Sequence, residues 1–245
     1  MKENLKNYPI DLNADLGEGG LYDEALLHIV TSANIACGGH TGNLDTMTIA
    51  VESALRNGVK IGAHPSYPDP ANFGRSPMAL SDKALHESIS NQINALKVVC
   101  ERLGAKMFHV KPHGAFYNNV AKNEAMGLVL IDVIKQVDPK LRLMILAGSP
   151  LVEQAKLAGL NVIQEAFADR AYLNDGSLAP RSREGAVIHD KQIALAQVKQ
   201  FIQQKPITSL DGQPLKINAD TICLHGDNEQ ALEFAKSIYQ LIQTK

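Results

Sequence analysis

Short, nearly continuous apolar runs rich in β-branched residues alternate with longer segments in which apolar residues recur at helical spacing. The run LRLMILAG at 141–148 is the most convincing buried strand among the short ones. The pattern predicts seven strands, at about 8–13, 32–37 around Ile35, 59–64, 107–111, 141–148, 161–168 and 221–226.

The longer segments carry the start and stop signals of helices. Ser149-Pro150 is an N-cap followed by proline at the first helical position, and Gly159 closes the helix that it begins. Gly58 and Gly104 likewise follow the last periodic residues of two other segments. Helices are therefore predicted at 22–31, 43–57, 81–103, 123–137, 149–158, 190–204 and 227–243.

Seven consecutive βα units predict a parallel sheet covered by helices. In length and strand count the chain suits an α/β barrel that is short of eight strands better than an open doubly wound sheet. A glycine-rich phosphate-binding fingerprint is also missing after the first strand. Since no linker or repeat interrupts the alternation, 1–245 are predicted to form one domain. The long irregular segment 169–189 is expected to cover the mouth of the barrel as a lid.

The composition is that of an ordinary globular protein of 245 residues, with 45% apolar and 20% charged residues. The formal charge of −2, from 24 basic and 26 acidic residues, offers no basic face for nucleic acid. No apolar stretch is long enough to span a membrane, and the first residues lack the apolar core of a signal peptide. The three cysteines show no CxxC spacing, which favours a reducing, cytoplasmic location without disulfides or a thiolate zinc site.

Ionisable side chains gather where the predicted strands end. Five of the eight histidines lie on or just after strands, whereas random surface placement would spread them over helices and loops. Active sites of parallel α/β folds lie at the C-terminal ends of the strands, so the pattern predicts a catalytic or ligand-binding mouth. The candidate residues, in strand order, are Asn13, Asp15 and Glu18; His40; His64; Lys111 and His113; Glu165, Asp169 and Arg170; and His225 and Asp227.

Two pairs among these residues have the spacing of cooperating groups. Asn13 and Asp15 are two positions apart, so in an extended chain they point to the same side, where paired acceptors suit general-base work or a cation. Lys111 and His113 flank Pro112 at a strand end, where the lysine can bind an anion while the histidine transfers a proton.

Structural roles compete with several of these assignments. Arg170 and Arg181 bracket the predicted lid and could clamp a carboxylate or a phosphate, or could be solvated at the surface. Glu18 could be a first-turn helix carboxylate. His109, one strand repeat below Lys111, is predicted to be a core histidine with its hydrogen bonds satisfied.

Eight short motifs in a fixed order resemble those of the LamB/YcsF lactam-utilisation family. The resemblance runs from about residue 9 to about residue 240, and eight ordered blocks are far more specific than any single motif. They are DLNADLGEG at 11–19, SANIACGGH at 32–40, IGAHPSYPD at 61–69, NFGRS at 72–76, HVKPHGAFYN at 109–118, EAFADRAY at 165–172, DGSLAPRS at 175–182 and CLHGDN at 223–228.

The resemblance implies an irregular seven-stranded (β/α) barrel of the glycoside hydrolase/deacetylase type. It also implies ATP-dependent opening of the lactam ring of 5-oxo-L-proline (pyroglutamate) to L-glutamate, with two further subunits, B and C. ATP would be a co-substrate, together with Mg²⁺, yet the chain contains no GxxxxGK[ST] loop. ATP is therefore expected to bind at an unfamiliar site here or in one of the partner subunits.

For this chemistry the candidates divide into two groups, and no metal ligand is assigned. Either Asp15 or His113 would act as general base for the attacking water. Lys111, with His40 or His64, would stabilise negative charge on the former carbonyl oxygen. The substrate-binding group contains the carboxylate clamp, Arg170 or Arg181, and also Asn13, Glu18, Glu165, Asp169, His225 and Asp227.

Two alternatives remain open from the sequence. The chain could be a metal-dependent, polysaccharide-deacetylase-like amide hydrolase in which Asp15, His40 and His64 hold a cation, a reading that metal analysis would test. It could also be a non-catalytic subunit that only binds substrate. Loss of activity on single substitutions at the mouth, with partner binding retained, would argue against the second alternative.

Overall fold

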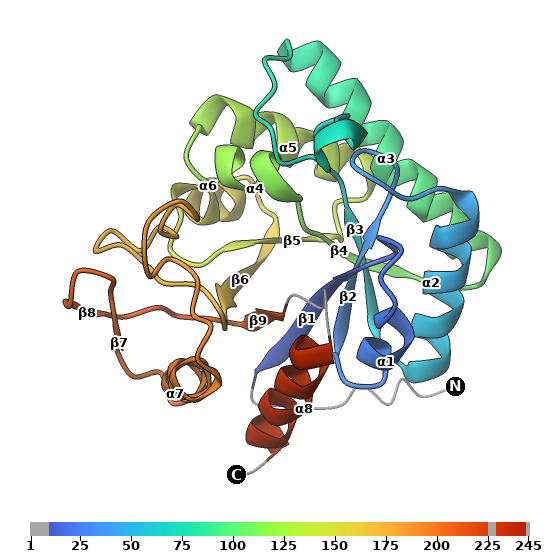
Figure 1. Cartoon of the computed structure of the whole chain (residues 1–245). Helices are drawn as coiled ribbons and strands as arrows, with labels where there is room; N and C mark the ends of the chain where they lie inside the picture. Colours follow the sequence, from blue (N-terminus) through green and yellow to red (C-terminus); the bar gives the residue numbers. More distant parts are fainter. Residues whose placement is uncertain (1–9, 225–228, 244–245) are drawn as a thin grey trace.

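A computed structural model describes residues 10–224 and 229–243 and shows a closed barrel of parallel strands at the centre of the molecule (Figure 1). The strands follow one another around the barrel in chain order, and the last pairs with the first. This confirms the predicted seven-stranded barrel. Its strands are β1 (Asp11–Leu16), β2 (Ser32–Ala36), β3 (Lys60–His64), β4 (Met107–Val110), β5 (Arg142–Leu146), β6 (Asn161–Phe167) and β9 (Thr221–Leu224).

Helices cover the outside of this barrel, where they bury the apolar residues that gave the sequence its helical periodicity (Figure 1). The predicted end signals act as expected: the Asn43 side chain accepts hydrogen bonds from two backbone N–H groups at the start of α2, and Gly58 ends that helix at a φ of 65°. The helices are α1 (Asp23–Leu27), α2 (Leu44–Asn57), α3 (Asp82–Arg102), α4 (Gly114–Val120), α5 (Glu124–Val137), α6 (Pro150–Leu157), α7 (Lys191–Ile202) and α8 (Glu229–Gln243).

The structure differs from the predicted elements at several points. β1 runs to Leu16 rather than to Asn13, so Asp15 is part of the strand instead of following it. The helix α4, the single 3₁₀ turn Pro70–Asn72 and a small antiparallel ribbon were not predicted. The ribbon consists of β7 (Ile207–Thr208) and β8 (Pro214–Leu215), too short to show a periodic pattern. None of the described helices is both long and apolar enough to cross a membrane.

The bottom of the barrel is tied together by one carboxylate. The Oδ1 atom of Asp11 accepts hydrogen bonds from Thr31 and Ser32 at 2.7 and 2.8 Å and lies 3.1 Å from the Lys60 Nζ. Its Oδ2 accepts one from Thr221 at 2.7 Å. Asp11 thus joins β1 to the starts of β2, β3 and β9. Burial raises the pKa of this carboxyl, but Lys60 and the hydroxyl donors outweigh burial and leave the pKa below its usual value.

We expect Asp11→Asn to lower the free energy of unfolding by about 2 kcal/mol at pH 7, because hydrogen bonds to a charged group contribute about 1.5–3 kcal/mol. A depressed pKa stabilises the fold above the unfolded-state pKa of about 3.9, and this contribution is lost as the pH falls through the folded pKa. Urea unfolding of both proteins from pH 7 downward measures the difference. A difference that stays constant into strong acid would contradict an ionic role for Asp11.

Candidate active site

A cavity of about 1000 Å³ opens at the C-terminal end of the barrel. Its walls are strand ends, the segment 169–189 that was predicted to be a lid, and residues of α7 and α8. It therefore lies where the strand-end rule places the working site of a parallel barrel. Of the predicted site residues, those that line it are Asp15, Glu18, His64, Lys111, His113, Asp169, Arg170 and Arg181.

Hydrogen-bonded amides form the barrel interior below this cavity. Asn34 on β2 donates from its Nδ2 to Asn13 Oδ1 at 2.7 Å and to Asp15 Oδ1 at 2.9 Å. Its Oδ1 accepts from His109 Nε2 at 2.7 Å, and the His109 ring fills the space over Gly62, where any side chain would collide with it. His109 is fully buried and is a core residue as predicted, but its hydrogen bonds are not all satisfied: among the described residues its buried Nδ1 has no hydrogen-bond partner. This network fixes the position of Asp15 from below.

Lys111 is the cation at the floor of the cavity. Its Nζ lies 2.8 Å from Asp15 Oδ1 and 2.8 Å from Glu165 Oε1, and 3.2 Å from both Asn13 Oδ1 and Cys223 Sγ. Burial lowers the pKa of this amine, but the two carboxylates outweigh burial and raise the pKa well above its usual value. Lys111 is therefore charged at neutral pH and holds both carboxylates in place.

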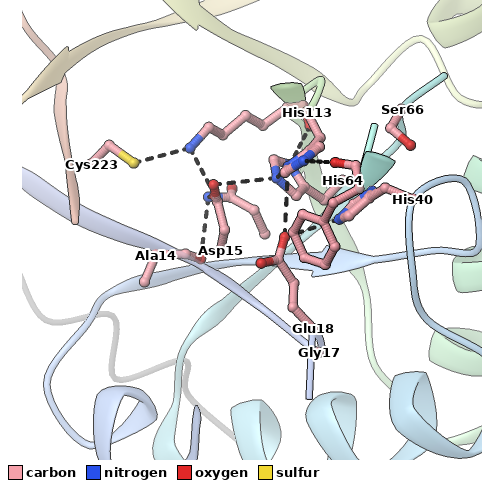
Figure 2. Close-up of polar contacts among 12 residues, drawn as sticks. Ala14, Asp15, Gly17, Glu18, His40, His64, Ser66, His113 and Cys223 are labelled. Atoms are coloured by element: carbon pink, nitrogen blue, oxygen red, sulfur yellow. Dashed lines mark hydrogen bonds and ion pairs between the residues drawn. The ribbon is translucent and has the colours of Figure 1, made fainter. Parts of the chain in front are cut away.

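Three histidine rings pack against one another beside Asp15 (Figure 2). His40 and His113 are stacked, with ring centroids 3.7 Å apart and planes 5° apart. His64 is nearly perpendicular to His113, and the two rings approach with Nε2 of His64 2.9 Å from Nδ1 of His113. His64 Nε2 also lies 3.3 Å from Asp15 Oδ2.

Glu18 completes this group from the loop after β1 (Figure 2). Its Oε1 is 2.9 Å from His40 Nε2 and 3.6 Å from His113 Nδ1. Burial, followed by the neighbouring histidines, lowers the pKa of both His40 and His113 to about 3, so both rings are neutral at pH 7. One donor atom from each of Glu18, His40, His64 and His113 lies within 4.8 Å of the others, an arrangement that could hold a metal ion.

The loop at 169–189, which lines the cavity, is held by Arg170. Its guanidinium donates to the backbone carbonyls of Ala179 and Ala186, and backbone hydrogen bonds Ala171–Ala186 and Ile188–Asp169 close the same loop. Arg170 is buried, with 7% exposure. The contacts of the Arg170 side chain are therefore mainly with the loop itself. Arg181 is exposed and lines the cavity.

We expect Arg170→Met to loosen the loop at 169–189, because each hydrogen bond from a charged donor contributes about 1.5–3 kcal/mol. Tryptic cleavage after Arg181 or Arg183 should become at least about tenfold faster, with 1.4 kcal/mol corresponding to a factor of ten. The matched control is Arg56→Met, an exposed arginine on α2. Equal cleavage rates in the two variants would show that Arg170 does not hold the loop.

The remaining predicted site residues lie apart from the cavity surface or outside the described part of the chain. Asn13 and Glu165 are fully buried below the floor, where both contact Lys111. His40 is buried behind His113. His225 and Asp227 belong to the residues that the structure does not describe.

Sequence reasoning missed several residues that line or support the cavity. Tyr117 and Arg75 line the cavity. The backbone carbonyl oxygen of Phe73 accepts a hydrogen bond from His113, and the side-chain amide of Asn34 donates one to Asp15. A signal was available for three of them, because the motifs NFGRS and HVKPHGAFYN contain Phe73, Arg75 and Tyr117. Asn34 lies in SANIACGGH, but its position inside the barrel depends on strand register.

Comparison with known proteins gives consistent matches over nearly the whole chain. The sequence model of the LamB/YcsF family matches residues 10–245. A protein of Neisseria meningitidis serogroup A, named as the A subunit of 5-oxoprolinase, is 48% identical over 231 residues, 94% of each chain. The protein of the same name from Haemophilus influenzae (strain PittEE) is 47% identical over 234 residues, 96% of each chain. The crystal structure of a lactam utilization protein from Thermus thermophilus superposes with a TM-score of 0.88 at 38% identity, covering 94% of each chain.

Proposed function

The chain belongs to the LamB/YcsF family, and we propose that it works as the A subunit of a 5-oxoprolinase, a hydrolase that opens the lactam ring of 5-oxo-L-proline to give L-glutamate. The observation that carries this proposal is the cavity floor, where Asp15, Lys111 and His64 meet in a chain 48% identical to a protein of that name. A cavity with a base and a fixed cation suits hydrolysis of an amide.

The chemistry explains why ATP would be needed. A five-membered lactam is a stable, unactivated amide. Phosphorylating its carbonyl oxygen makes the ring carbon electrophilic. One water then adds to that carbon, and the ring C–N bond breaks as its nitrogen is protonated, which gives a γ-glutamyl phosphate. A second water hydrolyses this acyl phosphate to glutamate and inorganic phosphate.

We assign the general base to Asp15 rather than to His113. Asp15 lines the cavity, whereas both ring nitrogens of His113 are occupied by Phe73 O and His64 Nε2. Lys111 acts through Asp15, which it orients from 2.8 Å, and its positive charge stabilises negative charge that develops on the substrate above it.

Arg181 is the better candidate for the carboxylate of 5-oxoproline, since Arg170 is engaged with the lid. The volume of about 1000 Å³ is at the upper end of the range of about 300–1,000 Å³ for small-molecule sites. It exceeds the need of one small lactam and supports entry of a larger, phosphorylated form of the substrate.

We place the reaction with ATP, together with Mg²⁺, in the assembly that this chain forms with subunits B and C in the cytoplasm. The absence of a GxxxxGK[ST] loop from this sequence supports that division of labour. In this scheme the partner subunits phosphorylate the lactam, and the barrel hydrolyses the activated product.

The test is glutamate release from 5-oxoproline and ATP, comparing the chain alone with the chain plus subunits B and C. Activity in the mixture alone supports the proposal. Activity of the isolated chain would contradict the division of labour and place an ATP site in this barrel. No glutamate release in either assay would overturn the proposed function. It would favour a metal-dependent amide hydrolase, the candidate that the cluster of Glu18 and three histidines supports.

A further inference from the structure

The hydrogen bonds around two histidines leave an unusual arrangement of protons. A carbonyl oxygen can only accept, so His64 Nδ1, 2.7 Å from the Lys111 carbonyl oxygen, carries a proton, and so does His113 Nε2, 3.0 Å from the Phe73 carbonyl oxygen. In neutral rings the remaining nitrogens, His64 Nε2 and His113 Nδ1, are both lone-pair acceptors. They face each other at 2.9 Å. Two acceptors at this distance repel unless a cation or an extra proton lies close to both.

Two carboxylate oxygens lie beside this pair of nitrogens. Glu18 Oε1 is 3.6 Å from His113 Nδ1, and Asp15 Oδ2 is 3.3 Å from His64 Nε2. A tetrahedral ion with bonds of about 2.0–2.1 Å to nitrogen and oxygen separates its ligand atoms by about 3.3–3.4 Å. Two of the three separations between the ligand atoms, 2.9 and 3.6 Å, bracket this value, and the third, between His64 Nε2 and Glu18 Oε1, is no more than 4.8 Å. Rotations of the side chains would bring all three to the required distance.

His40 supports the site without being a ligand in it. A metal bound to an imidazole lies close to the plane of that ring. The His40 and His113 rings are parallel and stacked at 3.7 Å, so an ion in the plane of His113 lies far outside the plane of His40. His40 Nε2 instead lies 2.9 Å from Glu18 Oε1 and orients that carboxylate by donating to it.

We propose that His64 Nε2, His113 Nδ1 and Glu18 Oε1 of the side chains in Figure 2 bind one divalent transition-metal cation of the Zn²⁺ class, with Asp15 beside the remaining coordination position. Two imidazoles and one carboxylate with an open position are a known ligand set for zinc. Mg²⁺ is excluded as the preferred ion because it favours oxygen ligands. His64 and His113 are 1% and 7% exposed, so the ligands are already ordered by their surroundings.

The direct test is calorimetric titration of the chelator-treated full chain with Zn²⁺, and with Co²⁺ followed by visible absorption. One equivalent should bind, and Co²⁺ should show the d–d bands of a low-coordinate site. His64→Asn and His113→Asn should each weaken Zn²⁺ binding by more than about 100-fold, and His40→Asn by about 10- to 100-fold, the range for groups that orient a ligand. The control His28→Asn changes an exposed histidine on the surface and should bind like the wild type.

Three results would overturn the proposal. The first is wild-type protein that binds no Zn²⁺ at micromolar concentration. The second is unchanged affinity in His64→Asn and His113→Asn with native circular dichroism, and Glu18→Gln repeats this test if either histidine variant fails to fold. The third is imidazole ¹⁵N spectra that show one imidazolium proton shared by the two rings in a chain that takes up no metal. All are measured without ATP, 5-oxoproline or partner subunits, so failure here and failure of the lactam reaction are separate outcomes.

Discussion

Lys111→Met is expected to abolish glutamate release by the assembled enzyme and to lower the free energy of unfolding by about 3–5 kcal/mol, because removing one partner of a buried ion pair leaves the remaining charge without compensation. The substitution leaves the carboxylates of Asp15 and Glu165 side by side without the ammonium that lies 2.8 Å from each. Urea unfolding of the isolated chain measures the stability, and glutamate release with subunits B and C measures the activity.

A double variant separates the two effects. Lys111→Met with Glu165→Gln removes one negative charge as well, so much of the lost stability should return while activity stays absent. Because the folded pKa of Lys111 is raised, its contribution is fully present below the unfolded-state pKa of about 10.4 and is lost as the pH rises through the folded pKa. The difference in free energy of unfolding between the wild type and Lys111→Met should therefore not become smaller between about pH 7 and pH 10. A stable and active Lys111→Met protein would remove the lysine from both roles.

Asp15→Asn is expected to lower kcat by about 10²–10⁴, the usual contribution of a general base, with a much smaller change in KM. The fold should survive, since an asparagine Oδ1 can still accept from Asn34 Nδ2 and Glu165 still pairs with Lys111. Steady-state glutamate release with saturating ATP measures both constants. The matched control is Asp132→Asn, an exposed carboxylate on α5.

Two outcomes would contradict the assignment of Asp15. Unchanged kcat in Asp15→Asn would show that another group accepts the proton of water. A large rise in KM at constant kcat would instead make Asp15 a binding residue, because uniform loss of binding leaves kcat unaltered. Circular dichroism and urea unfolding of the same preparations exclude loss of the fold as the cause.

The alternation of strands and helices was sufficient to predict the barrel. It also predicted that the cavity lies at the C-terminal ends of the strands. The prediction that Asn13 and Asp15 share a side is confirmed, because side-chain direction in a strand depends only on position parity. The predicted end of β1 was wrong by three residues, since polar Asn13 and Asp15 interrupt the apolar run that marks a strand. The same residues face the barrel interior, where hydrogen bonds from Asn34 satisfy their oxygens.

The pairing of the histidines could not be predicted from the chain. His40, His64 and His113 lie at or after the ends of three different strands, and their contacts depend on barrel curvature and on the backbone carbonyls of Lys111 and Phe73. Neither the curvature of the barrel nor the position of a backbone carbonyl group produces a periodic pattern in the sequence. For the same reason the sequence could not separate Arg170, which holds the lid, from Arg181, which lines the cavity.

The pairing of β1 with β9 has a consequence for biosynthesis. The hydrogen bond between Asp11 and Thr221 joins residues 210 positions apart, so the first strand lacks its last neighbour until β9 has left the ribosome. Until then β1 and β6 each present an unpaired strand edge, the feature through which nascent chains associate with one another. Closure of this barrel thus waits for β9, and until then both edges can pair with other chains.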